Sequence, residues 1–232
     1  MSTLLVIQPD PIVPLARFGD WLAEAGVELR VVRLFAGDPV PAEVAEDGLL
    51  VLGGTMSSLD DAGHPWLEQV RVLIRRAAEE RRPTLGICLG GQVMAQAFGG
   101  TVEPSADGIE NGVVEIQWRP DAADDALVGG LPAPFRTGEM HHDTITRLPG
   151  DAVWLGSTRQ TAHQVFRVGA CAWGVQFHPE LTSDVYRGWI EAEDGSHDEI
   201  AELTEGLDEF ARDEARLQAG NALVAYRFAA LL

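Results

Sequence analysis

The sequence predicts an α/β fold with an open, mostly parallel central sheet, flanking helices and a smaller antiparallel portion. Up to Gly99-Gly100, short apolar runs alternate with amphipathic helices, which is typical of right-handed βαβ units. Past that point, strand-like runs are separated by turn residues, which indicates hairpins and antiparallel pairing. From Ser183 onward the chain is polar and helix-prone.

The predicted parallel strands are short apolar segments. They are residues 4–8, 29–35, 48–52 and the run from Pro83 to Cys88. Two helices are predicted between them, because apolar side chains recur there at helical spacing. These side chains are Leu15, Phe18, Leu22 and Ala25 in the first helix, and Leu67, Val70, Ile74 and Ala77 in the second.

The second half of the chain predicts antiparallel strands and then a helical tail. The strand-like runs are residues 113–118, 152–155, 163–168 and 171–177. The acidic tail carries apolar residues near helical spacing, at Leu203, Leu207, Phe210 and Leu217. We therefore predict one domain over residues 1–190 and an acidic helical extension over residues 191–232 that packs on the same domain.

The composition is that of an ordinary globular protein, and it excludes several functions. Of the 232 residues, 46% are hydrophobic and 23% are charged. The formal net charge of −19 argues against nucleic acid as a partner, because phosphate binding needs clustered cations. All 17 basic residues are Arg, which excludes sites that depend on a P-loop, Schiff-base or kinase lysine.

The sequence carries no targeting or metal-binding signal. Met1-Ser2-Thr3 leads directly into an apolar strand, and no apolar stretch approaches the length of a membrane span. The two cysteines, Cys88 and Cys171, and six scattered histidines form no zinc-type ligand cluster. We therefore expect a cytoplasmic protein with reduced thiols, no membrane contact, no metal and no cofactor.

The most informative segment places a cysteine between a strand and a helix. An apolar run enters Gly86-Ile87-Cys88-Leu89-Gly90, and a short helical pattern follows at once. This is the cysteine counterpart of the Gly-x-Ser-x-Gly nucleophile elbow. The N–H groups and the dipole at the start of the helix favour the thiolate over the thiol. The pattern predicts that Cys88 is a nucleophile.

A second segment supplies the base that such a nucleophile needs. An apolar strand carries the chain to His178, and Pro179 ends that strand because it cannot donate to a sheet ladder. Glu180 then lies near the imidazole and can orient it. Alone, His-x-Glu after a strand more often indicates a structural pair. Beside a cysteine elbow, it predicts a nucleophile, base and acid triad of Cys88, His178 and Glu180.

Acyl transfer also needs donors aimed at the developing oxyanion. The elbow offers the N–H of Leu89, the residue after the nucleophile. The loop Gly53-Gly54-Thr55-Met56-Ser57 follows a neighbouring strand and ends at the same carboxyl edge of the sheet. Taken alone it reads as a plain turn, but here it is the expected source of a second donor.

These residues resemble the class I glutamine amidotransferases, the triad-type glutaminase family. Three blocks match in the family's order, namely 53–57, 86–92 and 174–180. The resemblance implies a flavodoxin-like glutaminase fold over residues 1–190. It also implies Cys88 as nucleophile, His178 as base and Glu180 as orienting acid. It further implies that Gly54 and Leu89 are the oxyanion donors and that Gln92 contacts the substrate.

Within that family, the chain is most similar to stand-alone members like the glutaminase domain of GMP synthase. Residues 140–144 resemble the His-Gly-Asp-Thr segment of those members, with His142 where glycine is usual. This resemblance implies that His141 lines the pocket. Residues 108–112 depart from the pattern, because glycine and glutamate stand exchanged relative to the usual Glu-Ile-Gly.

Three functions follow as alternatives. The first is a glutaminase that releases ammonia from glutamine, with a separate synthase as its possible ammonia acceptor. The second is a hydrolase of γ-glutamyl peptides or other γ-glutamyl amides that uses the same triad. The third is a non-catalytic binding or regulatory module, which the sequence disfavours because it has neither Gly-x-Gly-x-x-Gly nor a Walker motif.

Overall fold

The computed structural model describes residues 1–232, and its main sheet has nine strands. In spatial order they are β2 (Glu28–Arg33), β1 (Thr3–Gln8), β3 (Gly48–Val51), β4 (Thr84–Ile87), β11 (Ala172–Val175), β10 (Val165–Val168), β9 (Val153–Ser157), β6 (Glu110–Trp118) and β7 (Phe135–His141). Pairs from β2 to β11 are parallel, and pairs from β11 to β7 are antiparallel. The predicted fold class is confirmed, and the antiparallel strands continue the parallel sheet.

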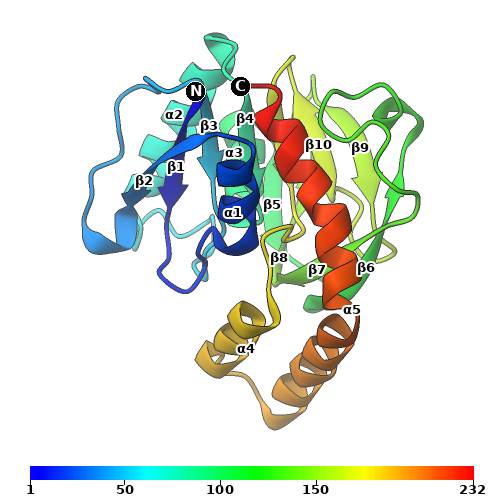
Figure 1. Cartoon of the computed structure of the whole chain (residues 1–232). Coiled ribbons are helices and arrows are strands. Elements are labelled where there is room, and N and C mark those ends of the chain that lie inside the picture. Colours follow the sequence, from blue (N-terminus) through cyan, green and yellow to red (C-terminus); the bar gives the residue numbers. More distant parts are fainter.

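Helices cover both faces of this sheet. Helices α1 (Ala16–Glu24) and α5 (His197–Ala229) lie on one face, and α2 (Trp66–Glu79) and α3 (Leu89–Ala97) lie on the other (Figure 1). An apolar core lies between the sheet and the helices on each face. Because successive strand residues point to opposite faces, β1 contributes side chains to both of these cores. Leu4 and Val6 belong to the core that includes residues of α1 and α5, whereas Leu5 and Ile7 belong to the core that includes residues of α2 and α3.

Three strands lie outside the predicted segments. β5 (Thr101–Pro104) and β8 (Asp143–Arg147) form a separate two-stranded antiparallel sheet. β7 was missed because its buried positions include the polar Thr137, Glu139 and His141, so that it lacks an apolar pattern. The predicted strand 29–35 ends early, at Arg33, where the chain turns into the 3-10 helix Leu34–Ala36.

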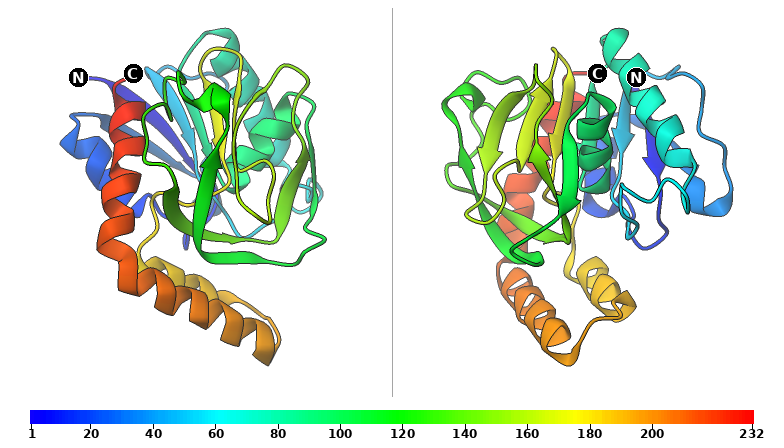
Figure 2. Two further views of the ribbon diagram at one scale, coloured as in Figure 1. Left: turned by 90° about the vertical axis from the view of Figure 1, so that its right-hand side faces the viewer. Right: turned by 180° about the vertical axis from the view of Figure 1, so that it is seen from behind.

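Two helices project beyond the carboxyl edge of the parallel strands. They are α4 (Ser183–Ala192) and the first half of the 33-residue α5 (Figures 1 and 2). The two chain termini lie at the opposite edge of the sheet. A third apolar core holds this projection to the sheet through Tyr186, Trp189, Leu203, Leu207 and Phe210. The domain boundary at residue 190 stays a prediction.

No helix in the structure combines the length and the apolar character that crossing a membrane would require.

Replacing Gly90 by alanine is expected to lower the free energy of unfolding by about 2 kcal/mol or more, because it overpacks the junction of α3 and β3. A Cβ at Gly90 would lie 2.8 Å from the carbonyl carbon of Val51 and closer still to its oxygen. Gly188→Ala in α4 is the matched control, since a Cβ there meets nothing within 4 Å. It should stabilise by about 0.5–1 kcal/mol. Urea unfolding measures both, and equal midpoints for the two variants would contradict the packing described.

Candidate active site

Cys88 lies on a strained turn between β4 and α3. The strand ends at Ile87, the helix begins at Leu89, and Cys88 between them has φ 50° and ψ −110°. Positive φ is uncommon outside glycine, and such strain persists only where the surroundings enforce it. The N–H of Cys88 donates to the carbonyl of Val175 (2.8 Å), and a Cβ at Gly91 would lie 2.8 Å from the same oxygen. Packing against β11 therefore fixes the turn.

His178 emerges from the neighbouring strand at the same edge. β11 and β4 pair in parallel, with Val175 opposite Ile87, so the residues that follow both strands meet at one end of the sheet. The N–H of His178 donates to the carbonyl of Gly138 (3.0 Å) in β7. Backbone hydrogen bonds thus place both Cys88 and His178.

The imidazole of His178 lies between Cys88 and Glu180. A Cβ on Gly53 would lie 3.2 Å from Cε1 of His178 and 3.5 Å from Cβ of Cys88. On the other side, Nδ1 of His178 lies 2.6 Å from Oε1 of Glu180, and both side chains are buried. The ring also packs on Trp189 of α4, with centroids 4.6 Å apart. The structure thus brings the three residues of the predicted triad together.

The electrostatic environment favours a charged His178. Burial works against the imidazolium, but the negative charges of Glu180 and Cys88 and hydrogen bonds with both outweigh it. The pKa of His178 is therefore raised well above its ordinary value. A histidinium beside a cysteine is the pairing that supports a thiolate nucleophile.

A cavity of about 410 Å³ opens over Cys88 and His178. Its wall includes every residue predicted to donate to the oxyanion or to contact the substrate, namely Gly54, Leu89, Gln92 and His141. Glu180 does not line the cavity and stands behind His178. Helix α4 and the residue after it close one side, through Trp189, Ala192 and Glu193.

The loop that carries Gly54 is held by a buried carboxylate. Asp10 follows β1 and accepts hydrogen bonds from the backbone N–H (3.1 Å) and the hydroxyl (2.5 Å) of Thr55. A Cβ at Gly54 would lie 3.0 Å from the side chain of Leu89, so the loop and the elbow touch. Sequence reasoning missed Asp10, although its place just after a parallel strand was the available signal.

Gln92 is part of a hydrogen-bonded wall behind the cysteine. Its amide nitrogen donates to the carbonyl of Asp143 (3.0 Å) and to the side-chain oxygen of Gln176 (3.2 Å). The amide nitrogen of Gln176 in turn donates to the sulfur of Cys88 (3.5 Å). Sequence reasoning missed this contact, although Gln176 lies in the His178 motif. Direct substrate contact by Gln92 stays a prediction.

His141 is among the residues that line the cavity, and both of its ring nitrogens contact the protein. Nδ1 lies 2.9 Å from the carbonyl of Asp143, and Nε2 lies 3.1 Å from Oε2 of Glu110. Glu110 is buried and begins β6, so the unusual segment 108–112 supplies the partner of His141. Gly112, with φ 87°, donates its N–H to the hydroxyl of Tyr186 (2.8 Å).

Several proteins of known sequence or structure are similar to this chain. The glutamine-hydrolyzing GMP synthase of Archaeoglobus fulgidus has a subunit that is 31% identical over 185 residues, which cover 73% of this chain and 87% of that one. The γ-glutamyl-L-1-hydroxyisopropylamide hydrolase of a Pseudomonas species is 28% identical over 205 residues, 81% of this chain and 68% of that one. The chain matches only 19% of the length of two GMP synthases from Porphyromonas gingivalis.

The fold is shared across nearly the whole chain. A glutamine amidotransferase from Methylobacillus flagellatus superposes with a TM-score of 0.84 at 28% identity, over 100% of this chain and 96% of that one. The family model described as "Glutamine amidotransferase class-I" matches residues 19–191. The chain therefore belongs to the class-I glutamine amidotransferase family.

Proposed function

We propose that this protein is a glutaminase that hydrolyses the side-chain amide of glutamine and releases ammonia. The observation that carries the proposal is the strained turn that holds Cys88 beside the buried His178–Glu180 pair. Nothing else in the cavity offers a nucleophile with its own base and orienting acid. Membership of the class-I family and the relatives named as hydrolases support the same reaction type.

The proposed reaction forms a covalent intermediate. The sulfur of Cys88 attacks the amide carbon, and the N–H groups of Leu89 and Gly54 stabilise the negative charge on the carbonyl oxygen. His178 gives its proton to the amide nitrogen, the C–N bond breaks, and ammonia leaves a γ-glutamyl thioester. Glu180 holds the imidazole through Nδ1 during this transfer.

Water completes the cycle. His178, now neutral, accepts a proton from the water that attacks the thioester carbon. The C–S bond breaks, glutamate leaves, and the thiolate of Cys88 and the imidazolium of His178 are restored. In both steps Gln176 donates to the sulfur, which lowers the cost of carrying negative charge there.

A second candidate is the hydrolysis of substituted γ-glutamyl amides by the same residues. The named Pseudomonas hydrolase favours it, and so does the cavity of about 410 Å³, which falls within the range of sites for small organic ligands larger than an amino acid. Trp189, Ala192 and Glu193 line the side formed by α4.

A separate synthase is the proposed acceptor of the ammonia. One relative is named as one of the subunits of GMP synthase, so a glutaminase of this family can be one chain of a larger enzyme. The proposed location is the cytoplasm, because a thiol nucleophile must stay reduced.

Parallel assays of leaving groups distinguish the two candidates. The protein is incubated with glutamine, with γ-glutamyl methylamide and with a γ-glutamyl alkylamide, and ammonia or amine release is measured beside the Cys88→Ala variant. Faster release from glutamine supports the glutaminase, and faster release from a substituted amide supports the second candidate. A γ-glutamyl thioester on Cys88 in the mass spectrum supports the shared mechanism. Release that is equal in wild type and variant on every donor would contradict both candidates.

A further inference from the structure

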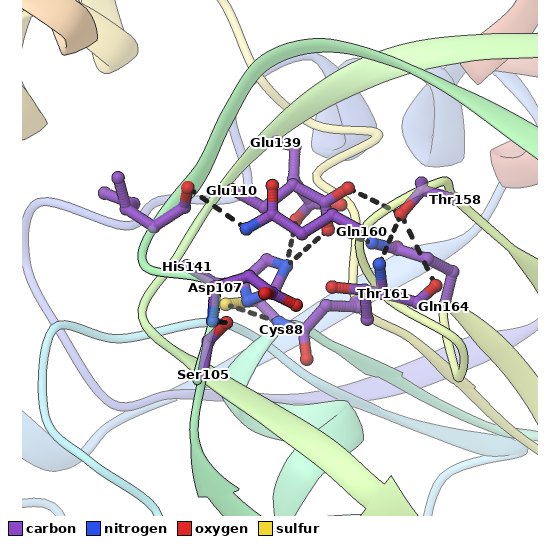
Figure 3. Close-up of polar contacts among 12 residues, drawn as sticks. Cys88, Ser105, Asp107, Glu110, Glu139, His141, Thr158, Gln160, Thr161 and Gln164 are labelled. Atoms are coloured by element: carbon purple, nitrogen blue, oxygen red, sulfur yellow. Dashed lines mark hydrogen bonds and ion pairs between the residues drawn. The ribbon is translucent and has the colours of Figure 1, made fainter.

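A buried group of polar side chains lies behind the cavity wall, close to Cys88 (Figure 3). It consists of Glu110, Glu139, His141 and Gln164, which we call the carboxyl cluster. Glu139 and Gln164 have no exposed surface, and His141 and Glu110 are 4% and 5% exposed. The reaction proposed above uses none of their ionisable groups.

Glu110 and His141 form a hydrogen-bonded pair within the cluster. Oε1 of Glu110 accepts from the hydroxyl of Thr158 (2.5 Å), and Oε2 accepts from the amide nitrogen of Gln164 (2.9 Å) and from Nε2 of His141 (3.1 Å). Burial opposes charge on Glu110, but hydrogen bonds from His141 and from hydroxyl groups outweigh it and lower its pKa.

Glu139 and Gln164 present acceptors without a donor. Neither carboxyl oxygen of Glu139 has a hydrogen-bond partner, and neither does the side-chain oxygen of Gln164. Nε2 of His141 lies 3.8 Å from Oε1 of Glu139, beyond hydrogen-bond distance. Turning the Gln164 amide over would not help, because its nitrogen donates to Glu110 and the turn would set its oxygen against that carboxylate. The two side chains lie within hydrogen-bonding reach of each other. Unpaired buried polar atoms are costly, so this corner of the cluster lacks one proton.

We propose that Glu139 is a neutral carboxylic acid that donates its proton to the side-chain oxygen of Gln164 and so acts as a positioning residue for the wall behind Cys88. Its surroundings agree with this state. Burial, followed by the negative charge of Glu110, raises the pKa of Glu139 well above its ordinary value.

A neutral Glu139 matters because of what faces it. The charged or ionisable groups around it are Glu110, His141, His178, Cys88 and Tyr186. A carboxylate at this position would oppose the negative charge of the thiolate and of the developing oxyanion. In the neutral state, Glu139 instead anchors Gln164, whose backbone carbonyl accepts from the N–H of Gln176 (2.8 Å). Gln176 is the residue that donates to the sulfur of Cys88.

A divalent metal is the competing occupant. Ligand atoms of Glu110, Glu139 and His141 lie within 4.8 Å of one another. Both oxygens of Glu110 already accept hydrogen bonds, however, and a single proton shared between Glu139 and Gln164 pairs two of the three remaining acceptor oxygens. The observations therefore favour the proton, and metal content is an outcome of the test.

The test compares Glu139→Gln with Glu139→Leu. The amide of the first variant can donate to Gln164 without ionising, whereas leucine fills the space without a donor. At neutral pH, the infrared difference spectrum between wild type and Glu139→Gln should show the carbonyl band of a protonated carboxylic acid. The kcat of Glu139→Gln should stay within about threefold of wild type, and that of Glu139→Leu should fall about tenfold.

Unfolding supplies a readout that does not depend on activity. Above about pH 4.3 the unfolded chain releases this proton and the folded chain keeps it, up to the raised pKa of Glu139. In that range the unfolding equilibrium constant of wild type should rise, relative to Glu139→Gln, by up to about tenfold per pH unit.

Three results would overturn the proposal. They are a missing carboxylic acid band, parallel pH dependences of unfolding, and a stoichiometric divalent metal in the purified protein that Glu139→Gln releases. The activity arm rests on the proposed glutaminase function, while the spectroscopic and unfolding arms do not. A silent enzyme with the expected band and slope would therefore count against the function alone.

Discussion

Replacing Cys88 by alanine will lower kcat on the preferred γ-glutamyl donor by about 10⁴-fold or more, with the fold retained. Loss of the nucleophile removes the covalent route, and losses of this order follow when a triad nucleophile is deleted. The remaining groups, His178 and the N–H of Leu89, can only assist direct attack by water. Steady-state kinetics measure the effect, and circular dichroism confirms folding.

Cys171→Ala is the matched control for this prediction. Cys171 lies just before β11, and its carbonyl accepts from Thr84 at the opposite end of β4 from Cys88. Burial raises the pKa of its thiol, which keeps it unreactive. The control should keep wild-type activity and should still be labelled at Cys88 by a glutamine-like electrophile. Preferential labelling of Cys171 in the wild type would contradict the assignment of the nucleophile.

Replacing Glu180 by glutamine will lower kcat by about 10²- to 10⁴-fold. The side chain is fully buried and 2.6 Å from Nδ1 of His178, so the variant keeps the shape and removes the charge. Without that charge, burial of the imidazole is opposed by Cys88 alone, and the pKa of His178 falls. As pH rises, the variant should therefore lose its imidazolium earlier than wild type does, and its kcat should begin to decline at a lower pH.

Stability should change with pH in a defined direction. A raised pKa of His178 stabilises the fold fully below about pH 6.5, where the unfolded imidazole is also protonated. That contribution is lost as pH rises through the folded pKa. The stability gap between wild type and Glu180→Gln should therefore narrow from about pH 6.5 upward, as urea unfolding can show. Glu191→Gln, an exposed change on α4, should leave activity and unfolding close to wild type, and a gap that widens with pH would refute this account.

Most of the parallel half of the fold can be predicted from the sequence, because the signals for its strands and helices are local. Apolar runs and helical spacing located β1, β3, β4, α1 and α2, and glycines around Cys88 marked the strand-to-helix turn. β7 gave no such signal, because its buried positions include polar residues and its backbone pairs with β6, which is distant in sequence. Long-range pairing of this kind depends on the assembled sheet.

The same limit applies within the candidate site. The residues that the motifs single out, Cys88, His178 and Glu180, do meet in the structure. The contacts of Gln176 with the sulfur and of Asp10 with the glycine loop join segments far apart in sequence. Side-chain hydrogen bonds of this range leave no periodicity to detect.

The hydrogen bonds between β4 and β11 have a consequence for how this protein can change. They fix the separation of Cys88 and His178 through the backbone, whatever the loops around them do. One side of the cavity is built elsewhere, by α4 and the residue after it. Mutations in that projecting part can alter which molecules are accepted while the reactive pair keeps its geometry. New selectivity can thus evolve on the helices without redesign of the chemistry.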